Sequence, residues 1–114
     1  MDRRGRDGIW IIDAQANTLY ANDRMAEILG TTVTALTGKP SFEYVFPEDV
    51  ERAQRLFGRK KSGDIEPFFF HLRRTDGSTI AVDVQGTPMH GPGGEFIGIV
   101  GTFRAVESAA VRGF

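Results

Sequence analysis

The chain has 114 residues, and its 14 Lys and Arg residues nearly balance its 15 Asp and Glu residues. This length allows one domain with a modest core, and the small net charge provides no field to hold nucleic acid or a membrane surface. Cysteine is absent, which excludes disulfides and Cys-ligated metals and fits a cytoplasmic protein, and no apolar run approaches the roughly 18 residues that span a membrane.

The N-terminal part of the chain predicts a β-hairpin. Residues 1–7 are polar and predict a flexible segment. Two short apolar runs, Gly8–Asp13 and Thr18–Ala21, then read as strands on either side of a turn. Because side chains alternate between the two faces of a strand, either Trp10 or Ile11 must point away from the core.

Two short helices are expected next. Asn22 or Asp23 caps the first helix, which ends at Gly30. Thr32 caps the second, which ends at Gly38. Their apolar positions follow helical spacing and predict one buried face for each helix. These positions are Met25, Ile28, Leu29, Val33 and Leu36.

A longer helix follows a single helical turn at Ser41–Phe46. Pro47 suits its first position, and Ser62-Gly63 closes it. Acidic residues lie at its start and basic residues at its end, which complements the helix dipole. Its apolar stripe, which we expect to be buried, consists of Val50, Ala53 and Phe57, with Leu56 beside it.

The last third of the chain predicts three strands of one sheet. Period-two alternation indicates the first two strands, and Phe96–Phe103 is apolar or small on both faces, as in a central strand. A three-residue loop, Thr75–Gly77, with its glycine left-handed, pairs Leu72 with Ile80 and keeps the apolar side chains on one face. Pro88–Gly94 predicts a longer second turn. The side chains expected to face the helices are Phe68, Phe70, Leu72, Ile80, Val82, Val84 and Ile99.

Strands that flank a run of helices indicate an α+β domain with an antiparallel sheet. Six short motifs also resemble those of the PAS family, in the family's order, over residues 8–106. Each motif is weak alone, but their order and spacing together are specific for the fold. The motifs are Gly8–Asp13, Tyr20–Asn22, Ile28–Gly30 with Leu36–Gly38, Val45–Asp49, Leu72–Ser78 and Gly98–Arg104.

The PAS resemblance implies a five-stranded antiparallel sheet in the order 2-1-5-4-3, with short helices and one longer helix over one face. It implies a sensory module, not an enzyme, which binds a small ligand or partner and biases an effector domain outside this chain. The implied parent is a bacterial two-component histidine kinase or, next, a diguanylate cyclase. The family usually has an aspartate after its last strand, where this chain has Ala105. Residues 107–114 would start a linker or helix.

The residues give little support to cofactor or metal chemistry. PAS flavin photosensors and yellow photoreceptors attach their chromophores through cysteine, and haem-binding members commonly use a histidine on the long helix. This chain has no cysteine, and no histidine lies between Val50 and Lys61. We therefore expect neither flavin nor haem, and an unidentified small apolar ligand remains open. His71 and His90 form no convincing metal or catalytic pattern, so no metal or catalytic residues are predicted.

The sequence leaves two interpretations of the core. Nine phenylalanines can fill a small core completely, which would leave a ligand-free interaction module. A cavity of roughly a few hundred cubic ångströms would instead indicate a sensor. Asn22, Tyr44 and Thr102 could orient a ligand there. The candidate pocket residues are Met25, Leu29, Phe42, Tyr44, Val45, Phe57, Phe70, Leu72, Val82 and Ile99.

The sheet face opposite the helices predicts an interface. Phe69 lies on the outward parity together with His71 and Asp83, and Trp10 is the outward candidate from the first strand. Exposed large apolar groups on one face suggest a partner. A homodimer through this face is the first expectation, and a cover formed by residues 107–114 is the alternative.

Overall fold

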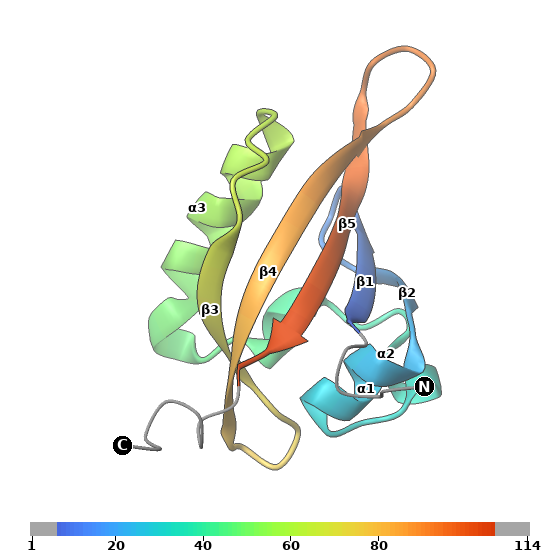
Figure 1. Cartoon of the computed structure of the whole chain (residues 1–114). Coiled ribbons are helices and arrows are strands. Elements are labelled where there is room, and N and C mark those ends of the chain that lie inside the picture. Colours follow the sequence, from blue (N-terminus) through green and yellow to red (C-terminus); the bar gives the residue numbers. More distant parts are fainter. Residues whose placement is uncertain (1–6, 107–114) are drawn as a thin grey trace.

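The computed structural model describes residues 7–106; the predicted C-terminal segment 107–114 and nearly all of the predicted N-terminal segment 1–7 lie outside the described residues. Helices cover one face of a sheet, and a long β-hairpin projects beyond it (Figure 1). In chain order the elements are β1 Gly8–Asp13, β2 Thr18–Ala21, α1 Asp23–Leu29, α2 Val33–Leu36, the 3₁₀ turns η2 Ser41–Tyr44 and η3 Pro47–Asp49, α3 Val50–Lys61, β3 Phe68–Arg73, β4 Thr79–His90 and β5 Phe96–Ala105.

The sheet is antiparallel, with the strand order β2-β1-β5-β4-β3, which confirms the predicted fold class. The β3–β4 turn has the predicted register, because Leu72 pairs with Ile80. The Arg74 N–H donates to the Ser78 carbonyl at 2.8 Å, and Gly77 has a φ of 88°. A side chain disfavours this left-handed backbone, which explains the glycine in the three-residue loop.

The β4–β5 hairpin is longer than predicted. Pro88 lies inside β4 opposite Ile99, and β4 continues to His90. A proline cannot donate to a sheet ladder, and it is tolerated on a free strand edge. β3 ends with Phe68 opposite Val84, so β4 has such a free edge at Pro88.

Side-chain caps fix the short helices. The Asn22 Oδ1 accepts from the Met25 N–H at the start of α1 and from the Ile9 N–H of β1, both at 2.9 Å. The Asn22 amide therefore joins α1 to the sheet in addition to capping it. Thr32 caps α2 by accepting from the Ala35 N–H at 3.1 Å.

The most completely buried side chains of the core belong mainly to α1 and α2. The β3–β4 turn closes this end, because the Thr75 N–H donates to the Leu29 carbonyl at 3.0 Å and the Thr75 hydroxyl donates to the Gly30 carbonyl at 2.6 Å. The largest fully buried side chains gather in this region or beside it. They are Met25, Ile28, Leu29, Leu36 and Val82.

Trp10 was predicted to point outward, and this prediction is wrong. The Trp10 side chain is 5% exposed and lies on the helix side of the sheet. The neighbours explain this orientation, because Trp10 is paired with Ala21 and Gly101, which leave room for the indole ring. The indole N–H donates to the Thr18 hydroxyl at 2.9 Å, so its polar group is also satisfied.

Candidate ligand site

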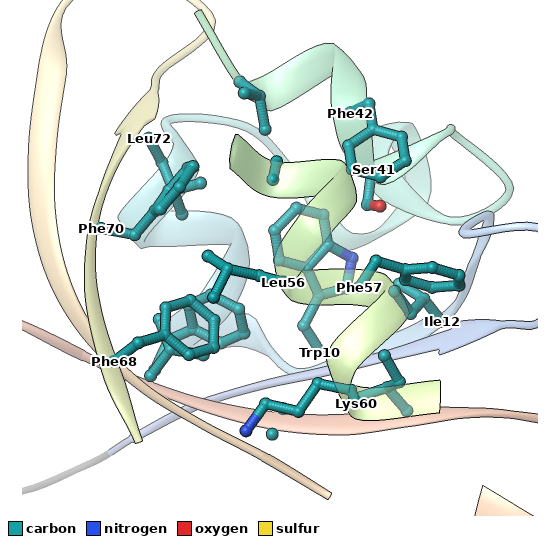
Figure 2. Close-up of a pocket in the computed structure, with 17 residues that line it drawn as sticks. Trp10, Ile12, Ser41, Phe42, Leu56, Phe57, Lys60, Phe68, Phe70 and Leu72 are labelled. Atoms are coloured by element: carbon teal, nitrogen blue, oxygen red, sulfur yellow. The ribbon is translucent and has the colours of Figure 1, made fainter. Parts of the chain in front are cut away.

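A cavity of about 120 Å³ lies between α3 and the sheet. Figure 2 shows side chains from the helix and the strands pointing into it. Its lining is almost entirely apolar, and six of the lining residues are aromatic or glycine residues of the strands. The lining residues are Trp10, Ile12, Ser41, Phe42, Val45, Ala53, Leu56, Phe57, Lys60, Phe68, Phe70, Leu72, Val84, Gly86, Ile99, Gly101 and Phe103.

The cavity exists because α3 does not pack fully onto the sheet. The predicted stripe faces the sheet, as shown by Ala53, Leu56 and Phe57 in the lining, but these residues are only half-buried. The prediction that the stripe faces the sheet is therefore confirmed, and the prediction that it is fully buried is wrong. The rings of Phe42 and Phe96 both contact Phe57 edge-on, at centroid distances of 6.3 and 5.8 Å, and hold the end of the helix.

Two glycines form part of the cavity floor. A Cβ at Gly86 would lie 3.3 Å from the Lys60 Cε, and a Cβ at Gly101 would lie 2.7 Å from the Phe103 ring. Because these positions lack side chains, the aliphatic part of Lys60 can pack against Gly86 and the Phe103 ring can pack against Gly101. The sheet thus contributes room to the site as well as apolar surface.

Lys60 is the only residue of α3 that is buried, with 3% of its side chain exposed. Its ammonium donates to the Glu66 carbonyl at 2.6 Å and lies 5.5 Å from the centre of the Phe68 ring. Burial lowers the pKa of Lys60, while the nearby Asp64 carboxylate opposes this shift. A cationic group therefore stands at the border of an otherwise apolar cavity.

Arg52 makes a polar connection between α3 and β3. Its guanidinium donates to the Phe69 carbonyl at 2.9 Å and lies 4.8 Å from the centre of the Phe70 ring. Phe69 belongs to an edge strand, where outward carbonyls lack a strand partner. Beside the cavity, Arg52 thus ties the helix to the edge strand β3, and Lys60 ties it to the loop before that strand.

The PAS fold family matches residues 6–106, which is most of the chain. The chain belongs to the PAS family. No curated protein matches it. Its sheet order and helix layer are those of the family, and PAS domains are regulatory sensory modules that are generally non-catalytic.

Solved PAS domains share this fold at low sequence identity. One from Colwellia psychrerythraea has a TM-score of 0.77 and 18% identity, over 90% of this chain and 87% of that chain. One assigned to a light and redox sensing histidine kinase from Haloarcula marismortui has a TM-score of 0.71 and 24% identity, over 90% of each chain. The PAS-B domain of Drosophila melanogaster Cycle, with bound ethylene glycol, has a TM-score of 0.75 and 16% identity, over 87% of this chain and 99% of that chain.

The PAS core brings some of the predicted pocket residues together and separates others. Met25, Leu29, Tyr44 and Val82 are buried but do not line the cavity, because they fill the core beside it. Six of the predicted residues do line the cavity. They are Phe42, Val45, Phe57, Phe70, Leu72 and Ile99.

The polar groups predicted to orient a ligand lie elsewhere. Asn22 is the α1 cap, and Thr102 pairs with Gln85 and Ile9 in the sheet rather than lining the cavity. Burial raises the pKa of Tyr44, whose ring contacts Trp10 edge-on at 5.8 Å. The polar residues that do line the cavity, Ser41 and Lys60, were not predicted.

The outer face of the sheet carries the other interface candidates. Phe69 is 46% exposed, pairs with Asp83, and contacts the His71 ring at a centroid distance of 5.1 Å. His71 and Asp83 are exposed as well. Ile11, rather than Trp10, is the first-strand residue of outward parity, and it is half-buried.

Within residues 7–106, no group of three or more His, Asp or Glu side chains is placed to hold a metal ion. Over the same residues, no helix is both long enough and apolar enough to cross a membrane. His71 lies on the outer sheet face, whereas His90 lies near Phe96 at the far end of the β4–β5 hairpin.

Proposed function

We propose that this PAS domain senses a small apolar or aromatic ligand, which binds between α3 and the sheet and biases an effector domain outside this chain. One observation carries the proposal: α3 is half-buried over a cavity of about 120 Å³ with an aromatic lining. An engineered apolar cavity of about 150 Å³ in another protein accepts benzene. The cavity therefore suits a ligand of roughly one ring and is smaller than the sequence-based expectation for a sensor.

The proposed site also argues against larger cofactors. Flavin and haem each contain several fused or linked rings, so either would have to displace α3 from the sheet. The chain has no cysteine for a covalent chromophore attachment. We expect the purified domain to be colourless, and stoichiometric visible absorption would contradict this part of the proposal.

A histidine kinase is the parent protein that we propose, with a diguanylate cyclase as the second choice. The fold shared with a domain of a histidine kinase from Haloarcula marismortui supports this choice by analogy. The absence of cysteine supports a cytoplasmic location, and the small net charge supports a domain that binds neither nucleic acid nor membrane.

Native mass spectrometry tests the ligand proposal most directly. The domain should carry a small organic molecule after gentle purification, or should take up added toluene with a stoichiometry of about one. A second measurement, two-dimensional amide NMR with toluene, should move the signals of Ala53, Leu56 and Gly86 and leave those of α1 in place. The absence of any uptake in both measurements would refute ligand binding at this site.

Homodimerisation through the outer sheet face is the second candidate function. The exposure of Phe69 beside His71 on an edge strand favours it. Phe69→Glu places a charge on this face and should shift a dimer to monomer in sedimentation velocity. Ile65→Glu is the matched control, because Ile65 is 59% exposed and lies in the loop before β3. If both variants and the wild type are monomers at micromolar concentration, this candidate is wrong.

A further inference from the structure

A groove lined by charged side chains lies next to the cavity between α3 and the sheet. A basic groove of about 200 Å³ runs beside it along α3. Leu56, Lys60 and Phe68 line both spaces, so these three side chains form the wall between them. The groove is lined by four cationic and two acidic side chains, with Leu56, Pro67 and Phe68. The charged ones are Arg52, Arg55, Arg59, Lys60, Asp64 and Glu66.

Lys60 stands at the boundary between the apolar and the charged space. Figure 2 shows its extended side chain along the border of the cavity that lies away from Ser41. An ammonium group has three N–H donors, and the structure gives Lys60 one hydrogen bond, to the Glu66 carbonyl at 2.6 Å. Within the described part of the chain, no carboxylate forms an ion pair with Lys60.

The nearby acids are engaged elsewhere. The Asp64 carboxylate pairs with Arg59 at 3.2 Å and also accepts from the Glu66 N–H at 2.8 Å. Glu66 is exposed and meets Lys60 through its backbone carbonyl rather than its carboxylate. A buried cation without an anionic contact is costly unless it finds a counter-charge. The Lys60 ammonium therefore has no direct carboxylate contact, and an anion placed against it would add one.

We propose that the cavity takes a small aromatic carboxylate, with its ring among the phenylalanines and its carboxylate at Lys60. This inference rests on the proposed function, because it names the ligand class for the same cavity. The volume of about 120 Å³ limits the apolar body to roughly one ring. The aromatic lining suits a planar ring, and the ammonium supplies two free donors for a charge-assisted contact. An inorganic anion would leave the apolar part empty, and an uncharged ring would leave Lys60 without its counter-ion.

Benzoate and benzamide form the test pair, because they share size and ring and differ in charge. In calorimetric titration of the wild-type domain, benzoate should bind at least about tenfold more tightly than benzamide. Equal affinities would overturn the inference. Both ligands are titrated into the wild-type domain, so this comparison does not require any variant to fold.

Lys60→Met removes the charge and keeps an unbranched stem against Gly86. It should bring the benzoate to benzamide affinity ratio to about one. Lys61→Met is the matched control, because Lys61 is the exposed neighbour and lines neither space; it should keep the ratio. A ratio that survives Lys60→Met would overturn the inference. If toluene binds and benzoate binds no more tightly than benzamide, only the inference of a carboxylate ligand is refuted. If none of the three probes binds, the proposed function is refuted as well.

Discussion

The two helical regions that cover the sheet pack differently. In α1, four of the seven residues are buried, and the β3–β4 turn closes the core beneath them. In α3, only Lys60 of the twelve residues is buried, and a cavity lies between part of the helix and the strands. The α1 end of the domain therefore holds the dense apolar packing, while the α3 end has room for a ligand. Regions with few buried contacts also open at lower free energy, which suits a site that must admit a molecule.

The first prediction compares core truncations at the two ends. Leu29→Ala should cost about 3 kcal/mol of unfolding free energy, because Leu29 has no exposed surface and its removal leaves a new void. Leu56→Ala is the matched change at the α3 end, where the side chain already borders a cavity. It should cost less than about half as much. Urea denaturation of both variants measures the difference, and equal losses would remove the distinction between the two ends.

The second prediction adds volume instead of removing it. Ala26→Leu in α1 should destabilise the domain by about 1–3 kcal/mol, because Ala26 is 3% exposed in filled surroundings. Ala53→Leu in α3 should cost less than about 1 kcal/mol, since its side chain can extend into the cavity. It should also abolish toluene binding measured by NMR. If Ala53→Leu destabilises as much as Ala26→Leu, or if toluene still binds, the cavity is not the available space that we describe.

The sequence was sufficient for the α1 end and for most of the sheet. Regular alternation in β3 and β4, the glycine of the turn and the caps Asn22 and Thr32 each carry a local physical signal. These signals predicted the strand order only together with the family resemblance. Wherever apolar and polar residues alternated, the sequence predicted which face of the sheet each side chain points to.

The parts that the sequence could not predict depend on distant neighbours. Trp10 lies in a run of three apolar residues without alternation, so its direction is decided by Ala21 and Gly101 across the sheet. Lysine is almost never fully buried, so Lys60 read as an ordinary helix-end cation. Its burial depends on the space left by Gly86, 26 positions further along the chain. The apolar residues of α3 have the same spacing as those of a fully buried helix. The spacing therefore does not reveal how closely the helix packs on the sheet.

The last prediction concerns pH and has the smallest expected effect. At the α1 end, Asp76 accepts from the Ser78 hydroxyl at 2.6 Å and from the Ser78 N–H at 2.9 Å. These bonds, the hydroxyl bond first, lower the pKa of Asp76 below its ordinary value of 3.8. At the α3 end, the Glu66 N–H is the first of the causes that lower the pKa of Asp64. Asp76→Asn and Asp64→Asn each keep an oxygen acceptor and remove the ionisation.

A carboxyl group with a lowered folded-state pKa binds fewer protons in the folded chain than in the unfolded chain. Its contribution to stability is therefore present above the unfolded pKa, near pH 4, and is lost as the pH falls through the folded pKa. Each Asn variant should be slightly less stable than the wild type at pH 7, and the difference should shrink as the pH falls below about 4. Urea unfolding between pH 7 and pH 3 measures it. A stability difference that stays constant over this range would show that the carboxylate charge contributes nothing at that turn.

Because Asp64 also pairs with Arg59 beside the basic groove, benzoate affinity should rise in Asp64→Asn and stay unchanged in Asp76→Asn, which again separates the two ends of the domain.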